Sequence, residues 1–226
     1  MKRDRPVIAI DGPAGAGKST VARAVASALG YLLVDTGALY RGVALAARER
    51  GVDWQHGDAL GALARTLDLR LVPDADGSAR LFIDGRDRSG EIRAPEISMG
   101  ASHVSRHPPV RDALRGIQRK LGEQGGAVLE GRDIGTVIFP DAEAKVFLTA
   151  SAETRARRRV EELHARGEAV EFEATLRDVQ TRDRQDSERE IAPLRPAEDS
   201  ILVDTSGKPV GKVVEEVLGI ARSRGA

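Results

Sequence analysis

A glycine-rich stretch near the start of the chain constrains the fold more than any other part of the sequence. Residues 8–20 read IAIDGPAGAGKST, in which Gly12, Gly17, Lys18 and Ser19 fit the phosphate-loop pattern G-x-x-x-x-G-K-[ST]. Glycines let successive backbone N–H groups turn inward around an anion, which a Cβ at those positions would hinder. The lysine then reaches the β- and γ-phosphates of a nucleotide, and the serine hydroxyl can ligate Mg²⁺.

The residues around this loop favour a nucleotide site over an ordinary glycine-rich turn. Val7–Ile10 is an apolar run of strand length, and Ser19–Leu29 places apolar residues at helical spacing before Gly30 as a stop. A strand, a glycine loop and a helix N-terminus form an anion site, because the helix dipole and free N–H groups point at the loop. We expect a nucleoside triphosphate to bind at Gly12, Pro13, Ala14, Gly15, Ala16, Gly17, Lys18, Ser19 and Thr20.

Five apolar runs separated by helical patterns predict an α/β fold. The runs are Val7–Ile10, Leu32–Val34, Ala127–Leu129, Lys145–Leu148 and Ser200–Val203. Such alternation predicts a five-stranded parallel sheet with helices on both faces, the arrangement of P-loop NTPases. The predicted helices are Ser19–Leu29, Ala38–Arg50, Pro95–Ser105, Pro109–Leu121, Ser151–Ala165, one starting at Phe172, and Pro209–Arg222. Ligands of open α/β sheets bind beyond the carboxyl ends of the strands, where DTGALYR (35–41) and EGRDIGT (130–136) fall.

The stretch 67–93 interrupts this rhythm. LDLRLVP, SARLFID and GRDRSGEIR read as short alternating strands, with turns at Asp76-Gly77 and Asp84-Gly85. We expect a small antiparallel insert within one domain that spans residues 1–226.

Composition excludes several classes of protein. The 35 basic and 35 acidic residues balance, so no global field attracts nucleic acid or anionic lipid. Cysteine is absent, which excludes disulfides and thiolate metal sites, and asparagine is absent, which excludes a guanine-reading N-K-x-D element. No apolar stretch approaches the ~20 residues that span a bilayer, and the N-terminus lacks a signal-peptide pattern. We therefore expect a cytoplasmic protein without nucleic-acid or membrane partners.

Two groups of charged residues have the spacing of a shared helix face. Arg155, Arg158 and Arg159 stand at i, i+3 and i+4, and they form either a solvated helix flank or a set that closes over a transferring phosphoryl group. Arg182, Asp186 and Arg189 stand at i, i+4 and i+7, provided that the helix from Phe172 persists this far. They form either a salt-bridged surface or a site for a phosphate and a ribose hydroxyl.

Further candidates are isolated side chains. Arg41, Arg111 and Arg132 are further candidates for site residues, the first and last because they lie just beyond strand ends. Asp133 could accept a hydrogen bond from the exocyclic amine of cytosine, or it could be a turn residue between two glycines.

The remaining chemistries are disfavoured. The two histidines at 103 and 107 are four apart, but a proline at 108 ends any helix and no third ligand is evident, so a metal site there is disfavoured. No cysteine and no histidine beside a suitable nucleophile argue against covalent catalysis.

Taken together, these motifs resemble the bacterial cytidylate kinases. The segments IAIDGPAGAGKST, DTGALYR, SGEIR, VRDALR, EGRDIGTVIFPDA and RDRQDSEREIAPL are collinear and extend from Ile8 to about Asp204, and EGRDIGTVIFPDA is the most specific of them. The resemblance implies transfer of the ATP γ-phosphoryl to CMP or dCMP with Mg²⁺, a nucleotide-monophosphate-binding insert at 67–93, and a lid at 151–167. Two departures are Thr36, where serine is common, and GKST in place of GKGT, so that Ser19 or Thr20 could supply the magnesium ligand and Ser19 is preferred.

The resemblance also implies roles for individual residues. Thr36, Arg111 and Asp133 would read the cytosine, Ser102, Arg182 and Asp186 would lie at the sugar, and Arg41, Arg132 and Arg189 would lie near phosphates. Catalysis would depend on Lys18, Arg155, Arg158 and Arg159.

Other functions fit the phosphate loop as well. The alternatives are another small-molecule or nucleoside monophosphate kinase, a non-catalytic nucleotide switch, and a nucleic-acid-binding ATPase. Neutral charge and few aromatic residues disfavour the last. We expect a monomer that binds only small nucleotides.

Overall fold

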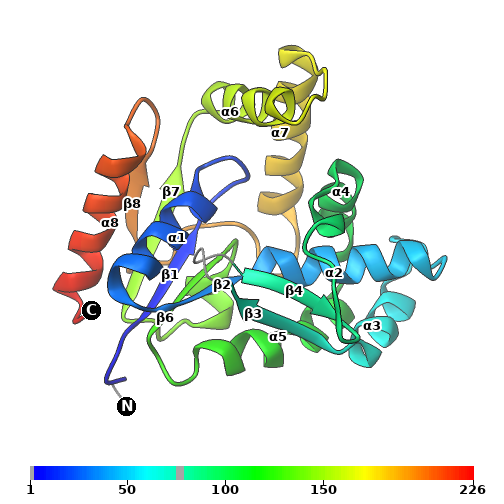
Figure 1. Ribbon diagram of the computed structural model, residues 1–226, viewed down its shortest axis with the longest axis horizontal. Helices are drawn as coiled ribbons and strands as arrows, with labels where there is room; N and C mark the ends of the chain where they lie inside the picture. Colours follow the sequence, from blue (N-terminus) through cyan, green and yellow to red (C-terminus); the bar gives the residue numbers. More distant parts are fainter. Residues whose placement is uncertain (1–2, 75–78) are drawn as a thin grey trace.

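The five predicted parallel strands form one sheet at the centre of the molecule (Figure 1). The computed structural model describes residues 3–74 and 79–226. The strands lie in the order β2-β6-β1-β7-β8, and every pairing in this sheet is parallel. Their bounds are β1 (Val7–Asp11), β2 (Leu32–Asp35), β6 (Ala127–Gly131), β7 (Ala144–Thr149) and β8 (Ile201–Asp204). The α/β prediction, with its five strands, is confirmed.

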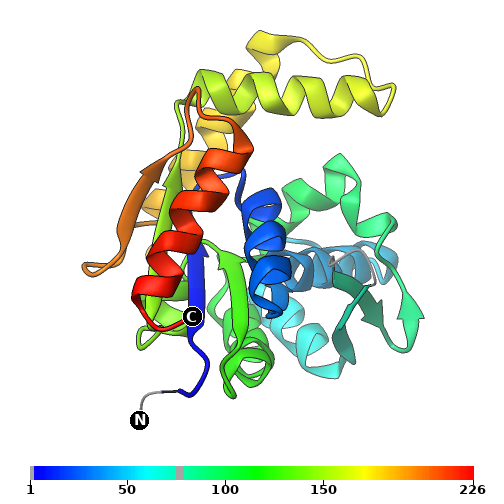
Figure 2. The ribbon, with the colours of Figure 1, turned by 60° about the vertical axis from the view of Figure 1, so that its left-hand side comes forward.

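Helices cover both faces of this sheet (Figure 2). The side chains of β1 alternate: Ile8 and Ile10 pack with α1 and α8 in one apolar cluster, whereas Val7 and Ala9 pack on the opposite face. A third cluster joins α2, α3, α4 and α5 to the small sheet. The helices are α1 (Lys18–Leu29), α2 (Thr36–Glu49), α3 (Gly57–Thr66), α4 (Pro95–Val104), α5 (Pro108–Gly122), α6 (Ala152–Ala165), α7 (Phe172–Glu188) and α8 (Val210–Ser223).

Seven of these eight helices match the sequence-based prediction closely. The sequence did not predict the helix α3 or a five-residue π-helical turn, η2 (Ile134–Ile138). Within the described ranges, 3–74 and 79–226, no helix is long and apolar enough to cross a membrane.

The predicted antiparallel insert is present, with one correction. It consists of β3 (Leu69–Pro73), β4 (Ala79–Ile83) and β5 (Arg86–Asp87). Asp84 and Gly85 form its two-residue turn with φ of +50° and +78°, whereas the predicted turn at Asp76-Gly77 lies outside the described residues. The strand prediction was wrong for the end of the third run, GRDRSGEIR. Residues 91–93 form a 3₁₀ turn, η1 (Glu91–Arg93), and not a strand. The reason is local, because the Asp87 carboxylate accepts the N–H of Ser89 and turns the chain away from the sheet.

The helices α6 and α7 stand beyond the carboxyl ends of the strands. Figure 1 shows them above the N-terminal end of α1, and Figure 2 shows α6 extending across the top of the molecule. The loop between β1 and α1 opens toward this pair of helices. The fold thus encloses the phosphate loop between the sheet and a helical arm.

Candidate active site

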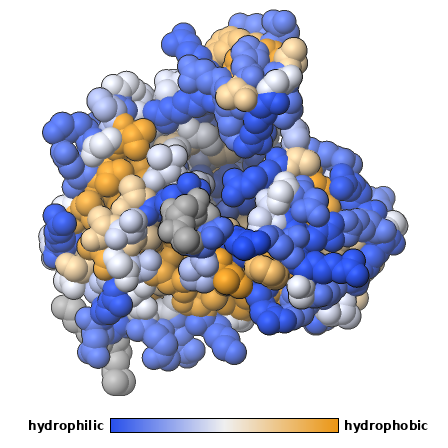
Figure 3. Space-filling view, in the orientation of Figure 1, coloured by the Kyte–Doolittle hydropathy of each residue, from blue (hydrophilic) through white to orange (hydrophobic). Residues whose placement is uncertain are grey.

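A cavity of about 1240 Å³ lies where the parallel strands end. Its walls come from the phosphate loop, the start of α2, α4, the loop after β6, α6 and α7. Figure 3 shows the molecule hollowed beneath α6, with hydrophilic residues around the opening. Every predicted site residue except Gly12 and Pro13 lines this cavity.

The phosphate loop has the backbone geometry that its glycines allow. Gly12, Gly15 and Gly17 have φ of +147°, +76° and +90°. A Cβ on Gly12 would lie 2.0 Å from the carbonyl oxygen of Leu148, so no side chain fits there. Lys18 opens α1, and its Nζ donates to the carbonyl oxygen of the proline at position 13 at 2.8 Å. Burial and the nearby arginine at 132 lower the pKa of this ammonium, so an added negative charge beside it is stabilised.

Oxygen ligands gather at the first turn of α1. Ser19 Oγ donates to Glu130 Oε2 at 2.8 Å. Burial and the nearby carboxylate of Asp35 raise the pKa of Glu130 to about 7. Asp35 in turn pairs with Arg41 at 2.7 Å. A hydroxyl beside carboxylates is a donor set that suits Mg²⁺. The described residues hold no group of three or more His, Asp or Glu side chains that could bind a metal by themselves.

Asp133 belongs to a buried ion-pair cluster. The carboxylate accepts from Arg111 Nη2, and its other oxygen lies 3.6 Å from Arg189 Nη2. Arg111 and Asp133 are 4% and 5% exposed, and Arg111 also donates to the carbonyl oxygen of Ser105 at 3.2 Å. The Arg111 guanidinium lies 5.6 Å from the ring centre of Tyr40. Because the Asp133 side chain does not cap its own turn, the geometry favours the paired carboxylate over the alternative of a turn residue.

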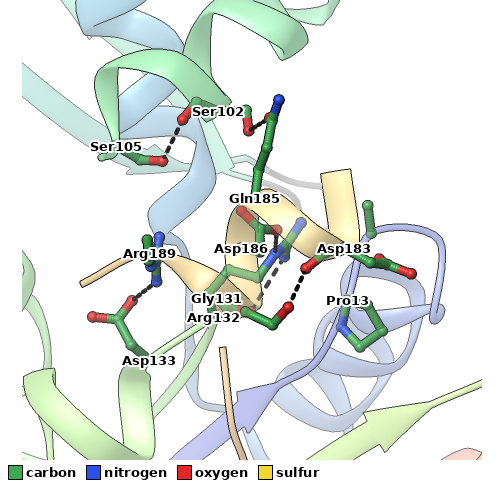
Figure 4. A network of polar contacts seen from close by, with 12 residues as sticks. Pro13, Ser102, Ser105, Gly131, Arg132, Asp133, Asp183, Gln185, Asp186 and Arg189 are labelled. Carbon is green, nitrogen blue, oxygen red and sulfur yellow. Dashed lines mark hydrogen bonds and ion pairs between the residues drawn. The ribbon is translucent and has the colours of Figure 1, made fainter. Parts of the chain in front are cut away.

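Three residues were predicted to share one face of the helix from Phe172, and two of them lie on that helix. Arg182 and Asp186 lie on α7, which ends at Glu188, so that Arg189 follows the helix in an extended conformation. Asp186 pairs with Arg132 at 2.8 Å (Figure 4).

Arg182 has no hydrogen bond or ion pair with the described residues, and its Nε is buried. Burial and the neighbouring Arg132 lower its pKa to about 10. A partly buried guanidinium without a protein partner gains from an anionic ligand.

The two remaining predicted site residues in the cavity wall, Ser102 and Thr36, form hydrogen bonds through their hydroxyl groups. Ser102 Oγ on α4 donates to Gln185 Oε1 on α7 at 3.1 Å, which joins two walls of the cavity (Figure 4). Thr36 Oγ1 donates to the carbonyl oxygen of Glu130 at 2.7 Å. Hydroxyl groups from α2 and α4 thus line the cavity.

The three arginines of α6 have different surroundings. Arg155 is buried and pairs with Asp183 of α7 at 2.6 Å. Arg158 donates to the carbonyl oxygen of Thr205 at 2.7 Å. It also donates to the carbonyl oxygen of Gly15, in the phosphate loop, at 3.4 Å. Arg159 pairs with a glutamate of its own helix at 2.9 Å. Arg158 and Arg159 are the ones with partly exposed side chains at the cavity.

Asp11, at the end of β1, was missed by the sequence analysis. Its two carboxylate oxygens accept the N–H groups of Ile134 and Gly135, each at 2.8 Å. This contact holds the π-helical turn that follows Asp133 against the start of the phosphate loop. A carboxylate immediately before the loop glycine was the available signal. Its partners are more than 120 residues away, and nothing in the local pattern names them.

The cavity carries positive charge although the chain as a whole is neutral. Thirteen basic and eight acidic residues occur among its described lining residues. Such a concave cationic surface raises the local concentration of anions. The arrangement suits two phosphate-bearing ligands, one at the loop and one at the wall formed by α4, α7 and the Asp133 cluster.

Comparison with known proteins identifies similar chains. Residues 8–223 match the family described as cytidylate kinase. The chain is 52% identical over 213 residues to the cytidylate kinase of Pelotomaculum thermopropionicum, with 94% of each protein covered. It is 46% identical over 224 residues to the cytidylate kinase of Vibrio cholerae serotype O1, with 99% of each covered. A solved gluconokinase from Sinorhizobium meliloti 1021 superposes with a TM-score of 0.51 at 18% identity, covering 98% of this chain and 94% of that one, a likeness of fold alone.

Proposed function

Because this chain belongs to the cytidylate kinase family, we propose that its cavity binds ATP at the phosphate loop and CMP or dCMP at the opposite wall. The enzyme is an ATP-dependent (d)CMP kinase, which transfers the γ-phosphoryl of ATP to give CDP or dCDP. The observation that carries the proposal is that the phosphate loop and the buried Arg111–Asp133 pair line one cavity. A base-reading carboxylate and a phosphate cradle in one space suit two nucleotides placed phosphate to phosphate.

The acceptor nucleotide is held by three sets of residues in this proposal. Thr36, Arg111 and Asp133 read the cytosine, since a carboxylate accepts from the N4 amine that cytosine has and uracil lacks. The sugar is held by Ser102, Arg182 and Asp186, and its phosphate by Arg41, Arg132 and Arg189. The guanidinium of Arg182, whose buried Nε has no partner among the described residues, supports an anion close to the sugar and phosphate.

The donor nucleotide occupies the loop from Gly12 to Thr20, with its β- and γ-phosphates at Lys18. The hydroxyl of Ser19, supported by Glu130, is the proposed protein ligand of Mg²⁺. When bound, the ion neutralises phosphate charge as the phosphoryl group transfers.

The transfer itself requires little from the protein beyond position and charge. An oxygen of the CMP phosphate is already ionised near pH 7, so it attacks the γ-phosphorus in line without a general base. Lys18, Arg158 and Arg159 stabilise the charge of the loose transition state, and Arg155 adds its charge from beneath the loop. We assign residues 151–167 as the lid that excludes water and residues 67–93 as the insert that borders the monophosphate. We further propose that the enzyme works as a cytoplasmic monomer.

A substrate panel tests this assignment. We expect the coupled release of ADP with CMP and dCMP to exceed that with UMP, AMP and GMP, and Lys18→Met to lower kcat by about 100-fold or more. The control Lys212→Met lies on the exposed face of α8 and should leave the rate unchanged. Preference for a non-cytosine acceptor would favour the alternative of another nucleoside monophosphate kinase. Near-normal turnover of Lys18→Met would refute the role given to the loop.

A further inference from the structure

Arg155 lies at the junction of three segments from different parts of the fold. Its side chain is 5% exposed. Nε donates to the carbonyl oxygen of Ala150 at 2.9 Å, and Nη1 donates to that of Ala14 at 3.2 Å. Both terminal nitrogens also donate to the carboxylate of Asp183, at 2.9 and 2.6 Å. One planar group therefore joins the end of β7, the phosphate loop and α7.

The segment of α7 held in this way carries the acceptor residues. Arg182 directly precedes Asp183, and Asp186 follows one helical turn later. Asp186 is fixed in turn by its ion pair with Arg132. Figure 4 shows Asp183 beside the loop that carries Pro13, with Asp186 on the same helix. A shift of Asp183 along or around the helix axis therefore moves the groups proposed to bind the sugar.

The phosphate loop packs on α6 without an intervening side chain. A Cβ built on Gly15 would lie 3.0 Å from the Cβ of Arg155 and 3.3 Å from its carbonyl oxygen. At such close packing the backbone of the loop cannot move independently of this part of α6. A displacement of the Ala14 carbonyl is thus transmitted to the guanidinium that also holds Asp183.

We propose that Arg155 and Asp183 are positioning residues that couple the two nucleotide sites. Occupation of the phosphate loop by ATP favours the position of α7 that binds CMP. By thermodynamic linkage, CMP then raises the affinity for ATP by the same factor. This inference rests on the proposed placement of ATP at the loop and CMP at the opposite wall.

The guanidinium geometry is what this role requires. Arginine presents donors on three sides of a rigid plane, so it can hold a carboxylate through two bonds and two backbone carbonyls at the same time. A lysine at 155 keeps the charge but lacks the planar fork. The coupling therefore depends on geometry as well as charge, which separates it from a simple electrostatic effect of α6.

Calorimetric titration of the full chain measures the coupling directly. The dissociation constant of CMP is determined alone and with saturating Mg²⁺ and a non-hydrolysable ATP analogue with a β,γ-imido bridge. We expect the analogue to tighten CMP binding by about fivefold or more in the wild type. In Asp183→Asn we expect this factor to fall to about one, because the bidentate ion pair is lost.

Two further variants make the result interpretable. Glu173→Gln removes one charge from an exposed position of α7 outside the cavity and should retain the wild-type factor. Arg155→Lys should lose the factor as Asp183→Asn does, and it serves in place of Asp183→Asn if that variant does not melt cooperatively.

Three outcomes would contradict the inference or its premise. A wild type without coupling, or either folded variant with the wild-type factor, overturns the role of Arg155 and Asp183. Failure of CMP or of the ATP analogue to bind the wild type contradicts the proposed function instead. The two failures are therefore distinguishable in one set of titrations.

Discussion

At the scale of single residues, the environment of each charged side chain decides its use. Asp133 is buried between Arg111 and Arg189, so its carboxylate is paired and oriented in the cavity wall. Arg182 is partly buried, with an enclosed Nε, and has no partner among the described residues. In the proposed function, the first side chain recognises a neutral amine and the second receives an anion.

Asp133→Asn should weaken the discrimination between cytosine and uracil. The carboxylate can only accept hydrogen bonds, which suits the N4 amine of cytosine, whereas an asparagine amide can also donate to the O4 of uracil. We expect kcat/KM for CMP to fall about 10- to 100-fold and that for UMP to fall less, so that their ratio decreases. Steady-state kinetics with both acceptors measure the ratio.

The matched control for this variant is Asp112→Asn, an exposed residue on α5 whose removal should change neither rate. A uniform loss of activity toward CMP and UMP would show that Asp133 acts only as a structural partner of Arg111.

At the scale of elements, one buried carboxylate joins the central strand to the turn after β6. Asp11 accepts two N–H groups of η2, and burial raises the pKa of its carboxyl to about 6. The folded chain therefore keeps a proton on this group at pH values where the unfolded chain has released it. The stability that this proton contributes is present below about pH 4 and is lost as the pH rises through about 6.

Asp11→Asn should remove this pH dependence. From pH 4 to pH 7 the wild type is expected to lose about 2 kcal/mol of unfolding free energy relative to the variant, since asparagine does not titrate. The raised pKa of Glu130 contributes equally to both proteins and cancels in the difference. Denaturant unfolding of both proteins at several pH values measures the difference in their unfolding free energies. Parallel curves for the two proteins would show that Asp11 titrates normally in the folded state.

The elements were predictable where the pattern is local. The strands and seven helices follow from apolar periodicity, and the phosphate loop and the segments 35–41 and 130–136 could be placed at the cavity because they lie just beyond strand ends. Helix α3 was not predicted, and its Gly61 is a residue that disfavours a helix in isolation. In the fold Gly61 is required, because a Cβ there would lie 2.3 Å from that of Pro109 on α5. Tertiary packing thus overrides a local signal.

The unpredicted part of the site consists of carboxylates with distant partners. Asp11 bonds to residues 123 and 124 positions away, and Glu130 bonds to Ser19 at 111 positions away. Asp183 is paired with Arg155 on another helix. Each was visible as an acidic residue, but only the topology of the sheet and the crossing of α6 with α7 bring the partners together.

At the scale of the whole molecule, the neutral chain places its excess of basic residues in one cavity. The phosphate loop and the Asp133 cluster share this space, so the fold offers a continuous site and not two separate pockets. A ligand that fills both ends should therefore bind with the combined contacts of two nucleotides.

A bisubstrate compound tests this continuity. Adenosine and cytidine joined through a chain of five phosphates should bind about 100-fold more tightly than ATP or CMP alone, because the second binding event becomes intramolecular. Competition against both substrates measures the affinity. The analogue with a second adenosine in place of cytidine should lose most of this gain. Affinity no greater than that of ATP would mean that the two ends cannot be occupied together.

The sheet order also has a consequence for biosynthesis. Strand β1, which ends in the phosphate loop, pairs only with β6 and β7, whose first paired residues are Ala127 and Ala144. A ribosome adds about 5 to 20 residues per second, so the buried strand VIAID waits at least about 6 seconds for its first neighbour. Throughout that interval an apolar segment with unpaired backbone is exposed on the nascent chain. The topology that centres the nucleotide site thus leaves β1, like β2, without its partner strand until β6 has been synthesised.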